Sequence, residues 1–213
     1  MTLVLGPEEV EQGTQFNSLV EEFKSRGFDY FEDPKAESYL NDGYLIDICE
    51  AEDWPFLEAE VLGEAPLEIT DVRSVEYVVD VPQMTKLAPL ERRWLTDGSV
   101  DLEEEGTPTY YYLDAGRILT TFPSSADELR VRYFAIPPRL EGEAYPVLPA
   151  RWHSLIVDAA VARAYADSDD FELERNAEEA FQRRLNRMRE GLLDVYRDGP
   201  SQFITVTNPD AMC

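Results

Sequence analysis

The spacing of apolar side chains changes twice along this chain of 213 residues. Residues 14–58 and 139–198 carry apolar side chains three or four positions apart, which is the period of an amphipathic helix. Residues 59–138 carry short β-branched runs in which apolar and polar positions alternate, which is typical of strands. The pattern therefore predicts helices at both ends and a sheet between them.

The first predicted helix follows an acidic leading segment. Thr14 is a suitable N-cap for it. Gly27 can adopt the left-handed conformation that ends the helix, with Phe28 packing back on Phe23.

A second helix is predicted from Asp33, the expected N-cap, with Pro34 in its first turn. Gly43 lies in its middle and costs about 1 kcal/mol relative to Ala, so we expect another backbone to approach closely there. The helix is predicted to end at "DWPF", because Pro55 disfavours the helical conformation for the residue before it.

The predicted sheet consists of short runs separated by glycine and proline. Its first strands lie within residues 59–81, and residues 87–95 ("LAPLERRWL") are expected to form a helical turn. An acidic loop leads to a β-hairpin over residues 109–122 whose turn uses Gly116 at positive φ. A further strand follows at residues 128–136, where apolar and basic side chains alternate.

Two more helices are predicted after a proline-rich linker. The first has an apolar face formed by Trp152, Leu155, Ile156, Ala159 and Ala160, and the second carries a stripe of Phe181, Leu185, Met188, Leu192 and Val195. Beyond them, "FITVT" (203–207) has the pattern of a strand without a neighbour in sequence. Its Phe203, Ile204 and Val206 are candidates for contact with another protein by strand addition.

These elements predict an α+β fold in which the N- and C-terminal helices form a helical bundle, with an inserted antiparallel β-sheet region and an extended C-terminal tail. The expected boundaries are 1–58 for the N-terminal helical part, 59–138 for the β-rich insert, 139–198 for the C-terminal helical part of the same domain and 199–213 for the tail.

Acidic residues outnumber basic ones by 44 to 19, which gives a formal net charge of −25. Residues 1–116 contain 28 acidic and 7 basic side chains, so most of the negative charge lies in the front half. This balance argues against a general nucleic-acid binder, because such proteins meet phosphates with clustered Lys and Arg. It favours either solubility or a surface that repels a polyanion, for which Glu103, Glu104 and Glu105 are candidates.

No residue pattern indicates catalysis, a metal site or a cofactor. The single histidine, His153, lies on a predicted helix, where a packed side chain is the commoner role; a hydrolase that uses it as a base is the alternative. Cys49 and Cys213 show no disulfide or metal-ligand spacing, which is typical of a reducing cytosol. No signal segment or membrane span is expected.

The last predicted helix carries a basic run, "QRRLNRMRE", on the side away from its apolar stripe. Two interpretations remain open for Arg183, Arg184, Arg187 and Arg189. They either pair with acids of their own helix, as Glu179 could with Arg183, or contact the acidic front half of a neighbouring copy.

Three consecutive tyrosines, Tyr110, Tyr111 and Tyr112, fall in the predicted hairpin. Side chains alternate along a strand, so Tyr110 and Tyr112 share one face and Tyr111 the other, and the three rings do not form one platform. A single-stranded nucleic-acid binder that uses these tyrosines with Arg117, Arg130 and Arg132 is the alternative.

Taken in order, five stretches resemble the head-to-tail adaptor (connector) proteins of tailed bacteriophages. They are "YLNDGYLIDICEAEDWPFLE", "RSVEYVVDV", "GTPTYYYLDAGRILTTFP", "LRVRYFAIPPRL" and "LPARWHSLIVDAAVARAYAD". The resemblance covers roughly residues 14–198 and rests on the combination, not on any single stretch.

The resemblance implies a structural virion protein that forms a ring, typically of twelve copies, beneath the portal protein. Such a ring joins the capsid to the tail machinery, leaves a channel through which DNA passes without specific binding, and assembles in the host cytoplasm. It implies no catalytic residue and no cofactor. A head-closure or tail-terminator protein is the alternative within the virion, although those proteins are usually shorter and mainly β.

Overall fold

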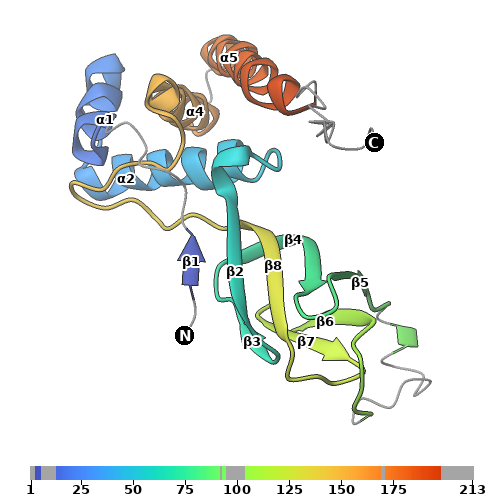
Figure 1. The fold of residues 1–213 in the computed structure, drawn as a ribbon. Helices are drawn as coiled ribbons and strands as arrows, with labels where there is room; N and C mark the ends of the chain where they lie inside the picture. Colours follow the sequence, from blue (N-terminus) through green and yellow to red (C-terminus); the bar gives the residue numbers. More distant parts are fainter. Residues whose placement is uncertain (1–2, 6–12, 92, 95–103, 169–170, 198–213) are drawn as a thin grey trace, which may run out of the picture.

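Helices gather at one end of the molecule and strands at the other in the computed structural model, which describes residues 3–5, 13–91, 93–94, 104–168 and 171–197 (Figure 1). The prediction of an α+β fold is confirmed. Each end has its own buried apolar cluster, one among the helices and one inside the sheet.

The first helix, α1 (Phe16–Phe23), continues into a π-helical turn, η1 (Lys24–Phe28). Gly27 has φ of 103°, and the rings of Phe23 and Phe28 stack with centroids 4.8 Å apart, so the predicted end of the helix is confirmed. The prediction that Thr14 caps the helix is wrong. Gln15 occupies the N-cap without a side-chain bond, and the Thr14 amide donates to His153 instead.

The second helix consists of α2 (Asp33–Asp42) and its π-helical continuation η2 (Gly43–Cys49), and its N-cap is Glu32, one residue before the predicted cap. A Cβ atom on Gly43 would lie 2.9 Å from Cβ of Ala159, so the predicted close approach is confirmed. A short 3-10 turn, η3 (Pro55–Leu57), follows the predicted helix end.

The central element of the helical part is α4 (His153–Ala166), which follows the 3-10 turn η4 (Ala150–Trp152). It packs against α1, α2 and η2 as well as against the last helix, α5 (Phe171–Arg197). Residues of the predicted apolar faces are buried there: Leu155, Ile156, Ala159, Ala160, Phe181, Leu185 and Met188. None of the described helices is both long enough and apolar enough to cross a membrane.

Eight described strands form the sheet: β1 (Leu3–Leu5), β2 (Glu58–Glu64), β3 (Leu67–Glu68), β4 (Val72–Asp80), β5 (Thr85–Pro89), β6 (Tyr110–Asp114), β7 (Ile118–Phe122) and β8 (Glu128–Ala135). Their order is β1-β2-β8-β4-β5-β6-β7-β3. Only Ala65 and Pro66 separate β2 from β3, although these strands lie near opposite ends of that order. The sheet therefore curves until it is nearly closed, and its apolar side chains pack inside.

Two expectations for the sheet are wrong. Residues predicted as the start of a helical turn form β5, whose Leu87 is buried in the sheet core, and among the described residues of that stretch only Arg93 and Trp94 are helical. The sheet is also not wholly antiparallel, because β5 pairs with β6 in the parallel sense. The hairpin of β6 and β7 is as predicted, with positive φ at Gly116 and also at Ala115.

Arg73 on β4 joins the sheet to the helical part. Its guanidinium donates to the carbonyl of Cys49 (2.5 Å) and to the carbonyl of Glu52 (2.8 Å), so it satisfies acceptors at and just beyond the C-terminal end of η2. A cation at a helix C-terminus is favoured because the exposed carbonyls carry negative partial charge.

Candidate interaction surfaces

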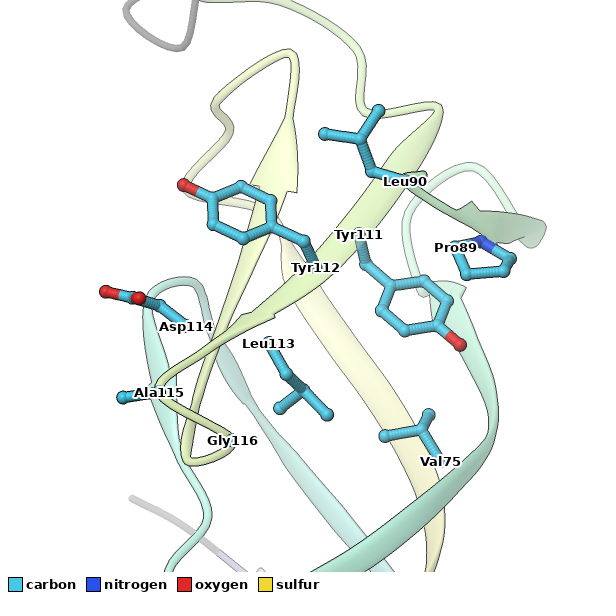
Figure 2. A pocket seen from close by; sticks show the side chains of 9 residues that line it. All are labelled: Val75, Pro89, Leu90, Tyr111, Tyr112, Leu113, Asp114, Ala115 and Gly116. Carbon is cyan, nitrogen blue, oxygen red and sulfur yellow. The ribbon is translucent and has the colours of Figure 1, made fainter. Parts of the chain in front are cut away.

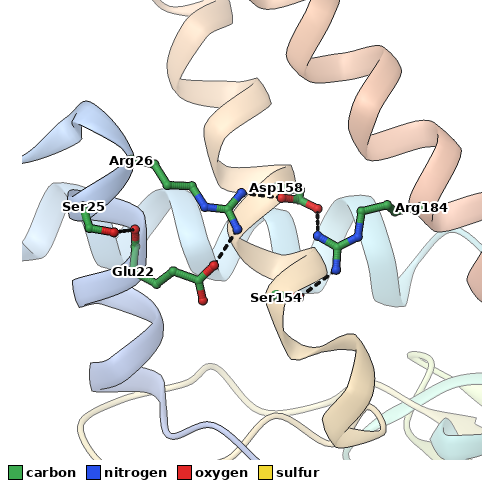
Figure 3. Close-up of polar contacts among 6 residues, drawn as sticks. All are labelled: Glu22, Ser25, Arg26, Ser154, Asp158 and Arg184. Carbon is green, nitrogen blue, oxygen red and sulfur yellow. Dashed lines mark hydrogen bonds and ion pairs between the residues drawn. The ribbon is translucent and has the colours of Figure 1, made fainter.

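The four arginines of the basic run on α5 have different environments. Arg184 points toward α4, where it pairs with the carboxylate of Asp158 and donates to Oγ of Ser154 at 2.7 Å (Figure 3). The other carboxylate oxygen of Asp158 accepts from Arg26 of η1 at 2.5 Å. Arg184 therefore connects helices of its own chain, an arrangement that the sequence did not indicate.

Among the remaining arginines of the run, Arg189 is as exposed as Arg184, and Arg183 and Arg187 are more exposed. Nε of Arg189 is 3.0 Å from Oε1 of Glu52, and Nη1 of Arg183 is 4.0 Å from Oε2 of Glu179, the pair that the helical spacing suggested. Arg187 is exposed and forms no ion pair with any other described residue. Arg183 and Arg187 are thus the members of the run with the most accessible charge.

The acidic loop that precedes the hairpin is described from Glu104 onward. Glu104 and Glu105 are exposed, and Glu105 forms an isolated bridge with Ser124. Glu103 lies outside the described residues, as do Phe203, Ile204 and Val206 and the whole of the predicted tail. For these positions the expectations from the sequence stand untested.

The three tyrosines are divided between the two faces of β6. Tyr111 is 9% exposed and belongs to the sheet core, whereas Tyr110 and Tyr112 are half-buried. Figure 2 shows the rings of Tyr111 and Tyr112 pointing to different sides of the strand. A pocket of about 570 Å³ lies beside them, lined by Val75, Pro89, Leu90, the residues from Tyr111 to Asp114, and the turn at Ala115 and Gly116.

Two of the three arginines considered for nucleic-acid binding lie close to carboxylates, whereas Arg117 is exposed in the turn between β6 and β7. Arg132 pairs with Glu58 on β2 and with Glu76 on β4, the latter at 3.1 Å. Arg130 is 3.7 Å from Glu60. The positive charge of Arg130 and Arg132, which a phosphate backbone would need, is therefore largely neutralised by neighbouring carboxylates.

His153 is buried at the start of α4 and joins two other segments of the chain. Its Nδ1 accepts the amide N–H of Thr14 at 2.9 Å, and its Nε2 lies 2.9 Å from the carbonyl of Leu148, to which it donates. This geometry fits the neutral Nε2–H tautomer. Burial lowers the pKa of the imidazole, although the nearby carbonyls of Leu148 and Thr14, which would accept from a protonated ring, oppose this effect.

Other groups of possible chemical use are dispersed. Burial raises the pKa of the Cys49 thiol to about 12, so the thiol is protonated at neutral pH. Within the described part of the chain, no group of three or more His, Cys, Asp or Glu side chains is placed to hold a metal ion.

Taken together, the described surfaces show ion pairs between elements and exposed acidic residues. The chain belongs to the SU10 adaptor protein family, whose model matches residues 20–203. This is a family of phage head-to-tail adaptors, structural proteins of the virion that interact with other phage structural proteins. A comparison with curated proteins gives no match.

Proposed function

We propose that this protein forms a ring of twelve copies beneath the portal protein and joins the capsid to the tail. The observation that carries the proposal is the family match over residues 20–203, which includes both the helical part and the sheet. In this role the protein assembles in the host cytoplasm and becomes part of the head–tail junction of the virion.

Contacts between copies use the outer side of α5. Arg183 and Arg187 are exposed there, whereas Arg184 and Arg189 are engaged with acids of their own chain. The front half of the chain offers many exposed carboxylates to such arginines. A ring requires two different surfaces that meet head to tail, and a basic helix with an acidic front half satisfies that requirement.

The DNA channel is lined by acidic residues of the front half and of the loop that contains Glu103, Glu104 and Glu105. A ring of twelve chains, each of net charge −25, carries about 300 formal negative charges. A negative wall lets DNA slide, because it forms no ion pairs with phosphates.

The tail of residues 199–213 docks onto a neighbouring copy or onto the portal, and the downstream partner is a tail, head-closure or tail-terminator protein. The support is the tail's apolar "FITVT" segment in a chain otherwise rich in acid. Docking by strand addition would satisfy the backbone of this segment while burying its apolar side chains.

The test is the mass of the purified protein measured by light scattering, alone and mixed with its portal protein. We expect a complex containing twelve copies on the portal, visible as a ring by electron microscopy. A monomer in isolation is compatible with the proposal if the ring forms on the portal. Failure to bind portal, together with binding to the distal end of an already assembled adaptor, would instead indicate a head-closure or tail-terminator role.

A further inference from the structure

An apolar groove lies where the helical part meets the sheet. It encloses about 420 Å³ and is lined by Leu45, Ile46, Cys49, Glu50, Arg73, Ala135, Ile136 and Pro137. Ile46 and Ile136 both line this depression, and they are 48% and 53% exposed, which is high for isoleucine side chains. Apolar surface left open in this way marks a site that another segment covers.

Of the polar side chains that line the groove, Arg73 already has partners and Cys49 is buried, whereas Glu50 is exposed and negative. The Arg73 guanidinium donates to the carbonyls of Cys49 and Glu52 and pairs with Asp53. The Cys49 thiol is buried. An occupant therefore gains little from hydrogen bonds with the floor of the groove and must be apolar.

The charge around the groove also limits its occupant. Glu50, Asp53 and Asp71 are exposed near it, so an acidic segment would be repelled. Residues 199–213 suit this surrounding, because Asp210 is their single charged side chain. Phe203, Ile204 and Val206 are concentrated in one short stretch of that segment, in contrast to the acidic chain that precedes it.

The course of α5 determines which groove the segment reaches. Arg189 contacts Glu52, whose carbonyl accepts from Arg73, so α5 passes beside the groove of its own chain. The helix then continues to Arg197, about 12 Å farther, and ends on the side of the molecule away from α1 (Figure 1). From there, residues 198–203 span up to about 20 Å when extended. To enter its own groove the chain would have to reverse direction after α5, whereas in the proposed ring it can continue toward an adjacent copy.

We propose that residues 203–206 of one copy occupy the groove between Ile46 and Ile136 of the next copy. The inference rests on the proposed ring and names the contact that links its successive subunits. Each copy donates one tail and accepts one, so the contact is heterologous and repeats around the ring.

Three full-length variants test the contact. The tail variant carries Phe203→Asp and Ile204→Asp, and the groove variant carries Ile46→Glu and Ile136→Glu. The control is Met84→Glu, which adds one of the two negative charges of the groove variant at a residue that is 76% exposed but lies in the turn between β4 and β5, outside the groove. Circular dichroism and melting curves establish that each is folded; glutamine replaces glutamate in the groove variant if it is not.

Binding is measured first with a fluorescent peptide of residues 199–213 and the tail variant as acceptor. We expect saturable binding that weakens at least about tenfold when the groove substitutions are added and is unchanged by Met84→Glu, because a carboxylate in an apolar contact loses its hydration. Absence of peptide binding, or equal binding with and without the groove substitutions, overturns the proposal.

Mixing then distinguishes a neighbour's groove from the chain's own. The tail variant still has a groove and the groove variant still has a tail, so the mixture should form a complex that neither forms alone. If the wild type stays monomeric at concentrations above the dissociation constant of the peptide while the mixture forms its complex, the segment occupies the groove of its own chain and the proposal is wrong. A mixture that gives no complex also overturns it. Portal binding is measured separately. A groove variant that binds the portal like the wild type but no longer binds the peptide has lost this contact and kept the adaptor function.

Discussion

The carboxylate of Asp158 on α4 accepts a hydrogen bond from the guanidinium of Arg184 on α5, although a basic run on an exposed helix would ordinarily face solvent. The same carboxylate also pairs with Arg26, which in turn pairs with Glu22 at 2.5 Å (Figure 3). The Asp158 side chain is only 12% exposed. Three helical elements thus converge on one partly buried charge.

Replacement of Asp158 by Asn should lower the free energy of unfolding by about 1–3 kcal/mol. The amide keeps the shape of the carboxylate but turns an NH₂ group toward one of two guanidinium groups. Urea unfolding measures the loss. The matched control is Glu179→Gln, which removes the exposed partner of Arg183 and should change the stability by less than about 0.5 kcal/mol. Equal effects of the two substitutions would show that the buried network does not stabilise the helices.

Replacement of Gly43 by Ala should destabilise the protein by about 1–3 kcal/mol, because the new methyl group would lie 2.9 Å from Ala159 Cβ and 3.2 Å from the amide nitrogen of Ala160. The control is Gly191→Ala on α5, whose Cβ would make only an ordinary 3.9 Å contact with Trp152. That substitution should be neutral or stabilising by up to about 1 kcal/mol, since Ala favours a helix. Thermal melting of both variants checks the contrast; an equally stable Gly43→Ala protein would contradict the close packing of η2 on α4.

Stability should depend on the protonation of His153. Burial lowers its pKa in the folded protein, so the unfolded chain binds a proton first as the pH falls. The stabilising contribution of the neutral ring is complete above the unfolded pKa of about 6.5 and is lost as the pH falls from there through the folded pKa. The comparison is with His153→Gln, which cannot titrate. As the pH falls from about 7.5 to 5.5, the urea midpoint of the wild type should fall relative to that of the variant. A constant difference between the two midpoints would refute the assignment of His153 as a buried, neutral ring.

Tyr111 should be a structural residue. Its replacement by Ala is expected to cost about 3 kcal/mol or more, because the ring fills the sheet core, whereas Tyr112→Ala at a half-buried position should cost less. The wild-type protein should not bind a labelled oligothymidine at low salt in fluorescence anisotropy. Binding that Tyr111→Ala abolishes without unfolding the protein would support the nucleic-acid alternative instead.

The wall of the channel in the assembled ring should be negative. A cryo-electron-microscopy structure of the ring on its portal should place carboxylates of the front half, with Glu104 and Glu105, toward the axis. Replacement of Glu103, Glu104 and Glu105 by Lys should slow DNA release from assembled particles, since lysines would pair with phosphates. Replacement by Gln is the control for the loss of charge alone. A neutral or basic bore would exclude this arrangement.

The sequence by itself determined the elements whose cause is local. Gly27 ends a helix because it tolerates positive φ, Gly116 does the same in the hairpin, and Gly43 marks a close contact because a costly glycine inside a helix needs a reason. The alternation along residues 128–136 likewise placed Leu129 and Val131 in the core.

Only the tertiary structure decided the relationships between distant residues. The stretch around Leu87 has apolar spacing that suits a helical turn, but it becomes a strand because β4 pairs with it on one side, at Leu87 itself, and β6 pairs with Ala88 and Pro89 on the other. Thr14 would cap a helix, yet its amide is bound by His153. Arg184 is a third case. Its position on the helix predicts a side chain that faces solvent or pairs with an acid of its own helix, but the packing of α4 on α5 places Asp158 beside it. Periodicity reports which face of an element is apolar, whereas the pairing of individual polar groups depends on how those elements come together in space.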